Sequence, residues 1–324
     1  MKTHQLIIIG AGPIGLACGI AATKADLDYV ILEKGVLVNS LYHFPEQMTF
    51  FSTSNLLEIG EVPFVSHSDK PTRKEALEYF RRVHDSWKLN IDLYTAVERM
   101  EKDGDAYVLK TSKGDFRTEA VIVSTGYYDT ARKLHIPGEN LPKVKHFYDS
   151  PHPYVDQDVL VIGAANSACD VALETYYKGA HVTMAIRGSE IYKKTKYWIK
   201  PNIENRIKEG SIKAYFNTEV KEIKPKSVIL KTPEGDVELD NDFVLAMIGY
   251  TPDYSLFEQL GLPIDEENQR QPIHDPETLE TPMQNVFVAG VINAGMDTST
   301  LFIENTRQHA DKIVNELKTR CVQS

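Results

Sequence analysis

Residues 6–33, LIIIGAGPIGLACGIAATKADLDYVILE, carry the clearest structural pattern in the sequence. A short apolar run leads into the turn Gly10-Ala11-Gly12-Pro13-Ile14-Gly15, a helix of small residues follows, and a second apolar run ends at Glu33. The pattern predicts strand, tight turn, helix and strand, with Gly10 making the turn, Gly12 admitting a pyrophosphate and Gly15 letting the helix pack closely. Unpaired N–H groups at the helix start attract phosphate, and Glu33 is spaced to accept hydrogen bonds from an adenosine ribose.

The same stretch has a competing interpretation as a secretory signal peptide, because residues 6–20 are almost uninterruptedly apolar. Only Lys2 precedes the run as a basic residue, and no small-residue cleavage site comes before Lys24-Ala25-Asp26. Three glycines and a proline would also break a membrane helix, and the run is too short to span a bilayer. The nucleotide-binding interpretation is therefore favoured.

The composition is that of a globular protein, with 42% apolar and 25% charged residues in 324. This length predicts two domains of ordinary size. A net charge of −10 without a long basic stretch argues against nucleic acid as a partner. No segment resembles a transmembrane helix, so we expect a soluble, cytoplasmic protein with no membrane partner.

The three cysteines, Cys18, Cys169 and Cys321, are far apart and form no C-x-x-C pair. Scattered cysteines in odd number suit a reducing compartment. The ten histidines are equally dispersed, with no pair at metal-ligand spacing on a recognisable element. The sequence therefore predicts no metal site.

A second nucleotide signature is DVLVIGAANSACD, residues 158–170. Gly163 ends a buried strand, and Asn166-Ser167-Ala168 opens a helix. Ala168 stands where the fingerprint tolerates alanine in place of its third glycine. Ala165 replaces the second glycine, and its methyl group limits how closely a phosphate can approach the backbone.

The strand that follows, residues 181–186, ends in Arg187 where the first unit ends in Glu33. Arginine removes an acceptor for a ribose 2′-hydroxyl and supplies a partner for a 2′-phosphate, which favours NADPH over NADH. Lys193, Lys194 and Lys196 follow closely; they either assist binding or form an ordinary solvated face. An acid-ended unit and an arginine-ended unit need different ligands, and FAD with NADPH is the natural pairing.

The loop after Glu33 is rich in aromatic and hydroxyl side chains, in particular at residues 42–45 and 50–55. It is either a surface loop over a sheet edge or a wall of a flavin pocket, and Lys34 and Phe51 are the candidate contacts. Beyond it, Thr72–Leu89 predicts an amphipathic helix that begins with a capping box of Thr72 and Glu75.

Two further strands end in glycine-containing turns. Residues 120–124 deliver Thr125-Gly126, and residues 285–290 end in Gly290. A helix is then expected from near Ser299 to about Lys318, with Phe302 among its apolar positions. Its start, around Thr300, is either aimed at the flavin or is a plain N-cap.

The order of these motifs resembles that of the two-dinucleotide-binding flavoprotein reductases, of which thioredoxin reductase is a small member. The middle of the chain lacks the redox cysteine pair of thioredoxin reductase. Longer strings resemble the YpdA-type bacillithiol disulfide reductase family: FFSTSNLLEIGEVPF (50–64), STGYYD (124–129), HPYVDQDVLVIGAANSACD (152–170), AMIGYTPDY (246–254) and AGVINAGMDTSTLFIEN (289–305).

This resemblance implies an α/β protein with two Rossmann-like domains, an FAD-binding domain of residues 1–135 and 252–324 and an inserted NADPH-binding domain of residues 136–251. It implies NADPH- and FAD-dependent reduction of a low-molecular-weight thiol disulfide such as bacillithiol disulfide, by a chain that forms homo-oligomers. The candidate cofactor contacts are Gly10, Gly12, Pro13, Ile14, Gly15, Glu33, Lys34, Phe51, Thr125, Gly126, Gly290, Thr300, Gly163, Ala165, Asn166, Ser167, Ala168, Arg187 and Lys193.

Two positions depart from the pattern that the resemblance implies. Ile14 stands where the family carries a cysteine in the first glycine turn, and Val291 stands where many flavoprotein reductases place an aspartate. Cys18, one helical turn beyond Ile14, is either a substitute nucleophile or a buried packing residue.

Three other functions stay open at this point. A ferredoxin- or flavodoxin-type NADPH reductase and a flavin monooxygenase both dispense with cysteine, although the F-x-G-x-x-x-H string of many monooxygenases is not intact at Phe147-Tyr148-Asp149. A flavin-binding redox sensor is the alternative outside enzymes.

Overall fold

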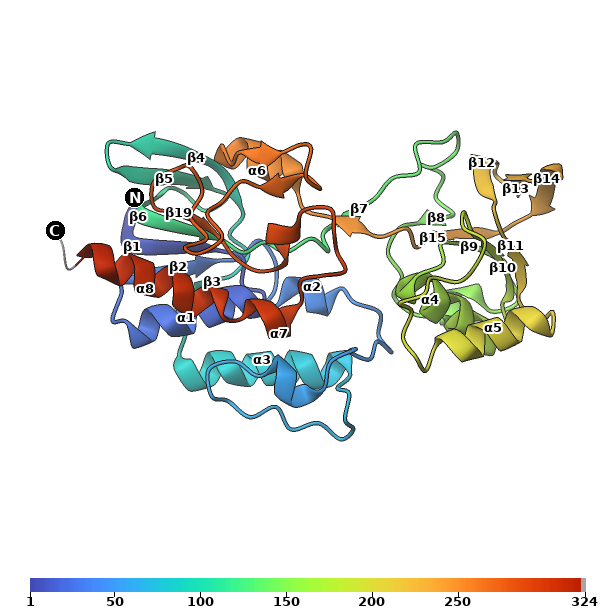
Figure 1. Cartoon of the computed structure of the whole chain (residues 1–324), viewed down its shortest axis with the longest axis horizontal. Helices are drawn as coiled ribbons and strands as arrows, with labels where there is room; N and C mark the ends of the chain where they lie inside the picture. The colour runs from blue at the N-terminus through green and yellow to red at the C-terminus, as the bar shows by residue number, and fades with distance from the viewer. Residues whose placement is uncertain (322–324) are drawn as a thin grey trace. The chain divides into compact units, whose positions relative to one another are not determined.

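Figure 1 shows a computed structural model of the chain, which describes residues 1–321. The chain divides into two compact units, unit 1 (Met1–Thr130 and Tyr250–Ser324) and unit 2 (Ala131–Gly249). Each unit is built on a parallel sheet with helices, which confirms the predicted α/β fold class. Among the described residues, no helix combines the length and apolar character needed to cross a membrane.

Unit 1 is formed by the N-terminal and C-terminal parts of the chain. Its strands are β1 (Lys2–Ile9), β2 (Tyr29–Leu32), β3 (Ile91–Asp92), β4 (Val97–Asp103), β5 (Ala106–Thr111), β6 (Phe116–Val123), β16 (Tyr250–Thr251), β17 (Ile264–Asp265), β18 (Gln271–Pro272) and β19 (Val286–Val288), with β7 (Thr130–Ala131) at the boundary. Its helices are α1 (Pro13–Lys24), α2 (Asn39–Tyr42), α3 (Arg73–Trp87), α6 (Tyr254–Leu260), α7 (Ile303–Thr306) and α8 (His309–Cys321), with the 3-10 turns η1 (Ser54–Leu57) and η3 (Val291–Ala294).

Unit 2 repeats the same plan with fewer elements. Its strands are β8 (Val144–Lys145), β9 (Asp158–Ile162), β10 (His181–Ala185), β11 (Lys213–Tyr215), β12 (Glu219–Ile223), β13 (Ser227–Thr232), β14 (Gly235–Asp240) and β15 (Phe243–Ala246). Its helices are α4 (Asn166–Tyr177) and α5 (Lys200–Lys208), with the 3-10 turn η2 (His152–Tyr154).

The large sheet of unit 1 has the strand order β3-β2-β1-β6, and the far edge of β6 is shared by two partners. The first half of β6 pairs with antiparallel β5, and the second half pairs with parallel β19, Val121 opposite Val286 and Val123 opposite Val288. Because β1, β2, β6 and β19 run in parallel, their carboxyl ends lie at one edge of the sheet. That edge is where a nucleotide is expected.

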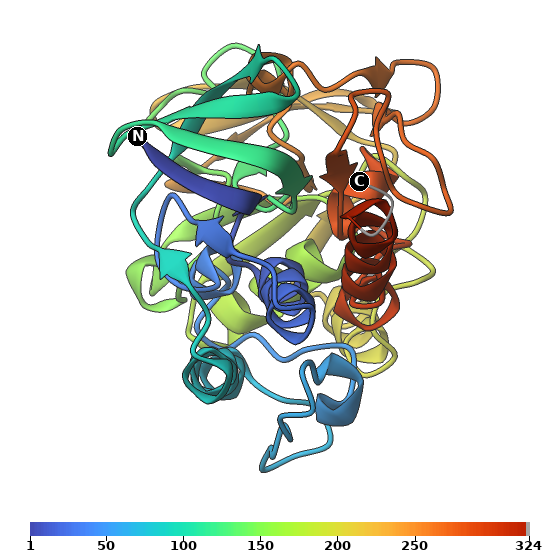
Figure 2. The ribbon, with the colours of Figure 1, turned by 90° about the vertical axis from the view of Figure 1, so that its left-hand side faces the viewer.

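The central strands of unit 1 are buried on both faces, as continuous apolar runs in parallel sheets usually are. Leu6 and Ile8 of β1 belong to the core beneath α1, α3 and α8, whereas Ile7 and Ile9 belong to a second core that includes α6. This alternation follows from the two-residue period of a strand. Figure 2 shows α1 in blue and α8 in red side by side on one face of this sheet.

Helix α3 has the N-terminus that the sequence predicts. Thr72 is its N-cap and accepts a hydrogen bond from the backbone N–H of Glu75, whose side chain bonds back to the N-cap, so the capping box is present. Phe80 and Val83 are buried, while Leu77 and Trp87 are half-buried. The buried face also includes Tyr79.

Unit 2 has a parallel sheet in the order β11-β10-β9-β15-β8. Val159 and Val161 of β9 face the core that contains α4 and α5, and Leu160 and Ile162 face the core built with β12, β13 and β14. In unit 2, helices α4 and α5 therefore cover one face of the parallel sheet, and the antiparallel strands β12, β13 and β14 pack against the other face.

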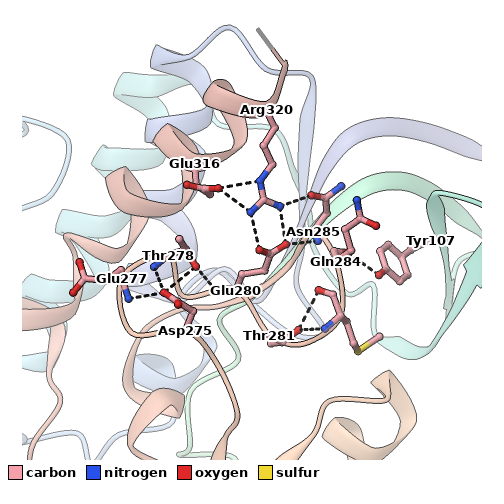
Figure 3. Close-up of polar contacts among 11 residues, drawn as sticks. Tyr107, Asp275, Glu277, Thr278, Glu280, Thr281, Gln284, Asn285, Glu316 and Arg320 are labelled. Atoms are coloured by element: carbon pink, nitrogen blue, oxygen red, sulfur yellow. Dashed lines mark hydrogen bonds and ion pairs between the residues drawn. The ribbon is translucent and has the colours of Figure 1, made fainter. Parts of the chain in front are cut away.

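The C-terminal helix is fixed to the connection that leads into β19 (Figure 3). Arg320 of α8 makes a bidentate ion pair with Glu280, with both N···O distances 2.7 Å, and also bonds Glu316 at 2.8 Å and Asn285 at 2.9 Å. The hydrogen bond from Arg320 is the main reason that the pKa of Glu280 lies below its ordinary value. Tyr107 anchors the same connection by donating to the carbonyl of Gln284 at 2.7 Å. These contacts set where β19 delivers Gly290.

Candidate functional site: two nucleotide cradles

The first glycine turn has the geometry that a phosphate cradle requires. Gly10 has φ +102°, and a Cβ there would lie 2.9 Å from the carbonyl oxygen of Ser124. A Cβ on Gly15 would lie 1.8 Å from the carbonyl oxygen of Gly10. A Cβ on Gly12 would meet no protein atom within 4 Å, so the space beside this glycine is open for a ligand. Gly10 and Gly15 are thus needed for packing, and Gly12 leaves space for a ligand.

Helix α1 begins at this turn without a side-chain cap. Gly12 is the N-cap, Pro13 occupies the first turn, and the first turn contains no acidic residue. The backbone N–H groups at this end therefore lack a side-chain acceptor, and the helix dipole adds partial positive charge. The arrangement suits a pyrophosphate.

Glu33 lies at the end of β2 and is buried. Its two carboxylate oxygens accept hydrogen bonds from the backbone N–H groups of Ala11 and Gly35, each at 2.8 Å. Burial raises the pKa of Glu33, and these two hydrogen bonds oppose the rise. A carboxylate offers about four acceptor positions, so capacity remains for a ribose hydroxyl.

One pocket in unit 1 extends from this acid across the turn to the end of β19. The predicted contacts that line it are Gly10, Gly12, Pro13, Ile14, Glu33, Lys34, Phe51, Thr125, Gly126 and Gly290. Phe44, Phe50 and Ser52 of the aromatic loop also line it, which favours the pocket-wall interpretation of that loop. Gly15 does not line it, because it faces the packed backbone of Gly10.

Two polar side chains on the pocket wall, Thr125 and Lys34, differ in whether the protein itself supplies a partner. Thr125 Oγ1 is buried and has no hydrogen-bond partner among the described residues. Lys34 is ion-paired with Asp129 at 2.8 Å. A buried hydroxyl without a partner costs stability, so Thr125 fits a site that a polar ligand completes.

Gly290 is held in place by a histidine of the C-terminal helix. Its backbone N–H donates to Nδ1 of His309 at 3.2 Å, so this ring nitrogen carries no proton. Burial lowers the pKa of His309 to about 4, which keeps the ring neutral near pH 7. Gly290 has φ +89°, and a Cβ there would contact the side chain of Ile14 at 3.2 Å.

The prediction of one continuous helix from near Ser299 is wrong: the helix starts later and is divided into two. Residues 298–300 form a turn, α7 spans only Ile303–Thr306, and α8 follows from His309. Thr300 is exposed, does not line the pocket, and its carbonyl accepts from Asn305 at 2.8 Å. Phe302 is 43% exposed rather than a core position. The cause is local: Asn305 caps the backbone N–H of Phe302 and starts the helix late.

Cys18 is not placed to attack a substrate. It is fully buried in α1, burial raises its pKa to about 12, and it does not line the pocket. Cys169 in unit 2 is also buried, with its pKa raised to about 12 for the same main reason. A buried, protonated thiol is inert as a nucleophile, which favours the packing interpretation of Cys18.

The second cradle occupies the matching place in unit 2. Gly163 has φ +128°, and a Cβ there would lie 2.6 Å from the carbonyl oxygen of Met247 and 3.1 Å from the Cβ of Ala168. Helix α4 begins at Asn166 with Ala165 as N-cap, no side-chain cap and no acid in its first turn. Ala165 and Ser167 are exposed. The helix start is thus open to solvent, as that of a phosphate site must be.

The basic residues near this cradle differ in their surroundings. Arg187 is exposed and forms no ion pair with a described residue. Lys193 is exposed and lies 3.4 Å from Glu190. Lys196 is buried and bonds Asp170 at 3.0 Å, so it does not belong to a solvated face. Of the three, the Arg187 guanidinium is therefore the most available to a phosphate.

Several wall residues were not among the predicted contacts, although some lie within the strings that carry the resemblance. They include Asn39, Ser40, Tyr127, Asp253 and Glu304. Glu304 accepts a hydrogen bond from Ser52 at 2.5 Å across a separation of 252 residues. Only the S-T-S cluster in the aromatic loop hinted that this part of the wall is polar.

Two strand–glycine turn–helix cradles, one ending in a buried acid and the other in an exposed arginine, define the class: a protein with two dinucleotide-binding modules. Comparison with known proteins agrees. Residues 7–290 match the family described as pyridine nucleotide-disulphide oxidoreductase.

Individual similar proteins indicate the group within this family to which the chain belongs. The chain is 41% identical over 322 residues, 99% of both chains, to the bacilliredoxin reductase Bdr of Bacillus subtilis strain 168. It resembles the structure of the bacillithiol disulfide reductase Bdr (YpdA) from Bacillus cereus, with 40% sequence identity and a TM-score of 0.95 over 98% of this chain and 100% of that chain. It also resembles the structure of Bdr (YpdA) from Staphylococcus aureus, with 38% sequence identity and a TM-score of 0.96 over 99% of each chain.

The chain belongs to the pyridine nucleotide-disulphide oxidoreductase family and, within it, to the group of the Bdr (YpdA) reductases. The resemblance seen in the sequence is therefore confirmed. Membership makes the protein an oxidoreductase that uses a flavin and a pyridine nucleotide.

Proposed function

We propose that this protein is an NADPH-dependent, FAD-containing reductase of a low-molecular-weight thiol disulfide such as bacillithiol disulfide. The observation that carries the proposal is the electrostatic contrast between the two cradles. A buried acid at the first rejects a 2′-phosphate and accepts a ribose hydroxyl, which suits FAD. An exposed arginine at the second attracts a 2′-phosphate, which suits NADPH.

The pocket of unit 1 fits a flavin dinucleotide on three counts. A Cβ on Gly12 would contact no protein atom within 4 Å, so a ligand has room beside this residue. The backbone N–H groups at the start of α1 can donate to a phosphate, and Thr125 Oγ1 has no hydrogen-bond partner among the described residues. Glu33 would hold the adenosine ribose, and the turn at Gly290 would line the other end. The bound flavin would take electrons from the pyridine nucleotide and pass them to the acceptor.

In this proposal, residues 1–135 and 252–324 bind FAD and residues 136–251 bind NADPH. The phosphate-binding turn of the second site would consist of Gly163, Ala165, Asn166, Ser167 and Ala168. Arg187 and Lys193 would contact the 2′-phosphate. The enzyme would act in the reducing cytoplasm as a homo-oligomer.

The direct test is anaerobic consumption of NADPH by the purified protein with bacillithiol disulfide. We expect turnover well above the rate without substrate, and a rate equal to that background would refute the proposed substrate. NADH in place of NADPH serves as the matched control for the nucleotide.

A second function, reduction of an iron–sulfur or flavodoxin partner by NADPH, is favoured by one observation. Neither Cys18 nor Cys169, the two cysteines whose side chains are described, lines the pocket of unit 1. One-electron partners need no protein thiol. Rapid reduction of ferredoxin together with inactivity toward the disulfide would select this alternative.

A further inference from the structure

The segment that follows β10 is bonded to the second glycine turn at two places. The backbone N–H of Tyr192 donates to the carbonyl of Ala164 at 3.0 Å. The backbone N–H of Lys196 donates to Oδ1 of Asn166 at 2.8 Å. Ala164 and Asn166 flank Ala165, the N-cap of α4. The residues between these two bonds are therefore held against the turn at which the helix begins.

Two lysines form the centre of this tethered segment. The backbone N–H of Thr195 donates to the carbonyl of Tyr192 at 3.0 Å, which closes a four-residue turn around Lys193 and Lys194. Both lysines are exposed. Lys193 lies 3.4 Å from the exposed Glu190, a surface pair of little energetic weight, and Lys194 forms no ion pair with a described residue. Both ammonium groups therefore remain available to an anion.

Lys196 differs from these two lysines because it is buried. Its Nζ donates to Oδ2 of Asp170 at 3.0 Å. Asp170 comes one helical turn after Asn166 in α4, so one face of the helix holds both the backbone and the side chain of Lys196. Lysine is rarely buried unless its charge is paired. The pair with Asp170 thus fixes the residue that ends the tethered segment.

Apolar packing fixes the chain on both sides of the lysine turn. Ile191, directly before Tyr192, is buried in the core that contains residues of α4, and Ile199 packs against the same core. The exposed lysines thus lie between two anchored positions. A charged turn that is already ordered loses less conformational entropy when it binds an anion than a free loop would.

We propose that Lys196 is a positioning residue for nucleotide selectivity: clamped by Asn166 and Asp170, it holds Lys193 and Lys194 where they contact the 2′-phosphate. A 2′-phosphate gains charge-assisted hydrogen bonds from these ammonium groups, whereas a 2′-hydroxyl gains none. The clamp therefore acts on the affinity for the phosphorylated nucleotide and not on the reaction that follows. This inference rests on the proposed function, in which NADPH binds at the second cradle.

The test measures binding of 2′,5′-ADP and of AMP, which differ only in the 2′-phosphate, to the full-length protein by calorimetry. Relative to wild type, we expect the double variant K193Q/K194Q to bind 2′,5′-ADP about tenfold more weakly and K196M about fivefold more weakly. Binding of AMP should stay within about twofold in both. The control K178Q removes an exposed lysine at the far end of α4 and should change neither affinity. In steady-state kinetics, K196M should raise the KM for NADPH and leave kcat unchanged.

A double-mutant cycle separates positioning from general support of unit 2. Because Lys196 acts through the lysine turn, adding K196M to K193Q/K194Q should weaken 2′,5′-ADP binding by less than about twofold. The full fivefold loss in that background, or an equal loss of AMP binding in K196M, would overturn the inference. If K196M does not fold, the exposed pair decides: wild-type affinity of K193Q/K194Q for 2′,5′-ADP overturns it. A wild type that binds AMP as tightly as 2′,5′-ADP refutes the proposed use of NADPH instead, so the two failures are distinguishable.

Discussion

The two cradles share the same strand–turn–helix–strand backbone. They differ in the residues of the turn and in the residue that follows the second strand. In unit 1, three glycines form the turn and the next strand ends in Glu33, which is buried and bonded to Ala11 and Gly35. In unit 2, alanines replace two of the glycines and the next strand leads to exposed Arg187. In the proposed function, the shared turn would hold the pyrophosphate, and the residue after the second strand would select which dinucleotide binds.

The glycines also differ in what they do. Gly15 is needed because the protein's own backbone fills the space of a side chain, whereas Gly12 is needed only if a ligand fills that space. Packing and binding can therefore be separated by mutation within a single turn.

The largest effect is expected for Gly15→Ala. The new methyl would lie 1.8 Å from the backbone oxygen of Gly10, so the strand or helix must shift. We expect the free energy of unfolding to fall by about 3 kcal/mol, at the upper end for overpacking, with loss of flavin. Urea unfolding and flavin absorbance of the purified protein measure both. The matched change in unit 2, Ala168→Gly, should cost only about 1 kcal/mol through helix propensity; equal effects of the two changes would contradict the account.

Gly12→Ala should weaken flavin binding without unfolding the protein. A methyl at this position meets no protein atom within 4 Å but would occupy the space given to the pyrophosphate. We expect flavin affinity to fall about 100-fold, the loss of one to two charge-assisted hydrogen bonds, with the free energy of unfolding of the flavin-free protein unchanged. The reciprocal Ala165→Gly in unit 2 should tighten NADPH about threefold. Full flavin content in G12A would place the ligand elsewhere.

Arg187→Ala tests the selectivity of the second cradle. Removing one exposed guanidinium partner of a phosphate costs about 2 kcal/mol, so the KM for NADPH should rise about 30-fold while that for NADH stays within twofold. Lys178→Ala, an equal change of charge at the far end of α4, is the control. A parallel loss for both nucleotides would show that Arg187 does not read the 2′-phosphate.

Glu33→Gln tests the first cradle through pH. Because burial raises the pKa of Glu33 in the folded state, its contribution to stability is full below the unfolded pKa and is lost as pH rises through the folded pKa. Flavin-free wild type should therefore lose stability relative to E33Q as the pH rises above the ordinary carboxyl pKa of about 4.3, as urea unfolding can measure. E33Q should also bind flavin about 10-fold more weakly, through loss of the charged ribose acceptor. The reverse pH trend would mean that the two backbone hydrogen bonds outweigh burial.

Local sequence patterns predicted the parts of the molecule that local geometry controls. The strands around both turns, the turns themselves at Gly10 and Gly163, and the capping box of α3 each depend on residues only a few positions apart. The α/β class followed from the repeated strand–turn–helix pattern.

Features that depend on distant segments could not be read in advance. The pairing of Ser52 with Glu304 joins residues 252 positions apart. The clamp of His309 on Gly290 depends on how α8 packs, and the late start of α7 depends on Asn305 rather than on the preceding Ser and Thr.

We propose that two cradles of opposite preference serve one flavin. An anaerobic titration of the purified protein, followed by flavin absorbance, is the decisive test. We predict one FAD per chain and bleaching by stoichiometric NADPH, with NADH needing a concentration at least tenfold higher. A protein without flavin, or one that NADH reduces as readily as NADPH, would contradict it.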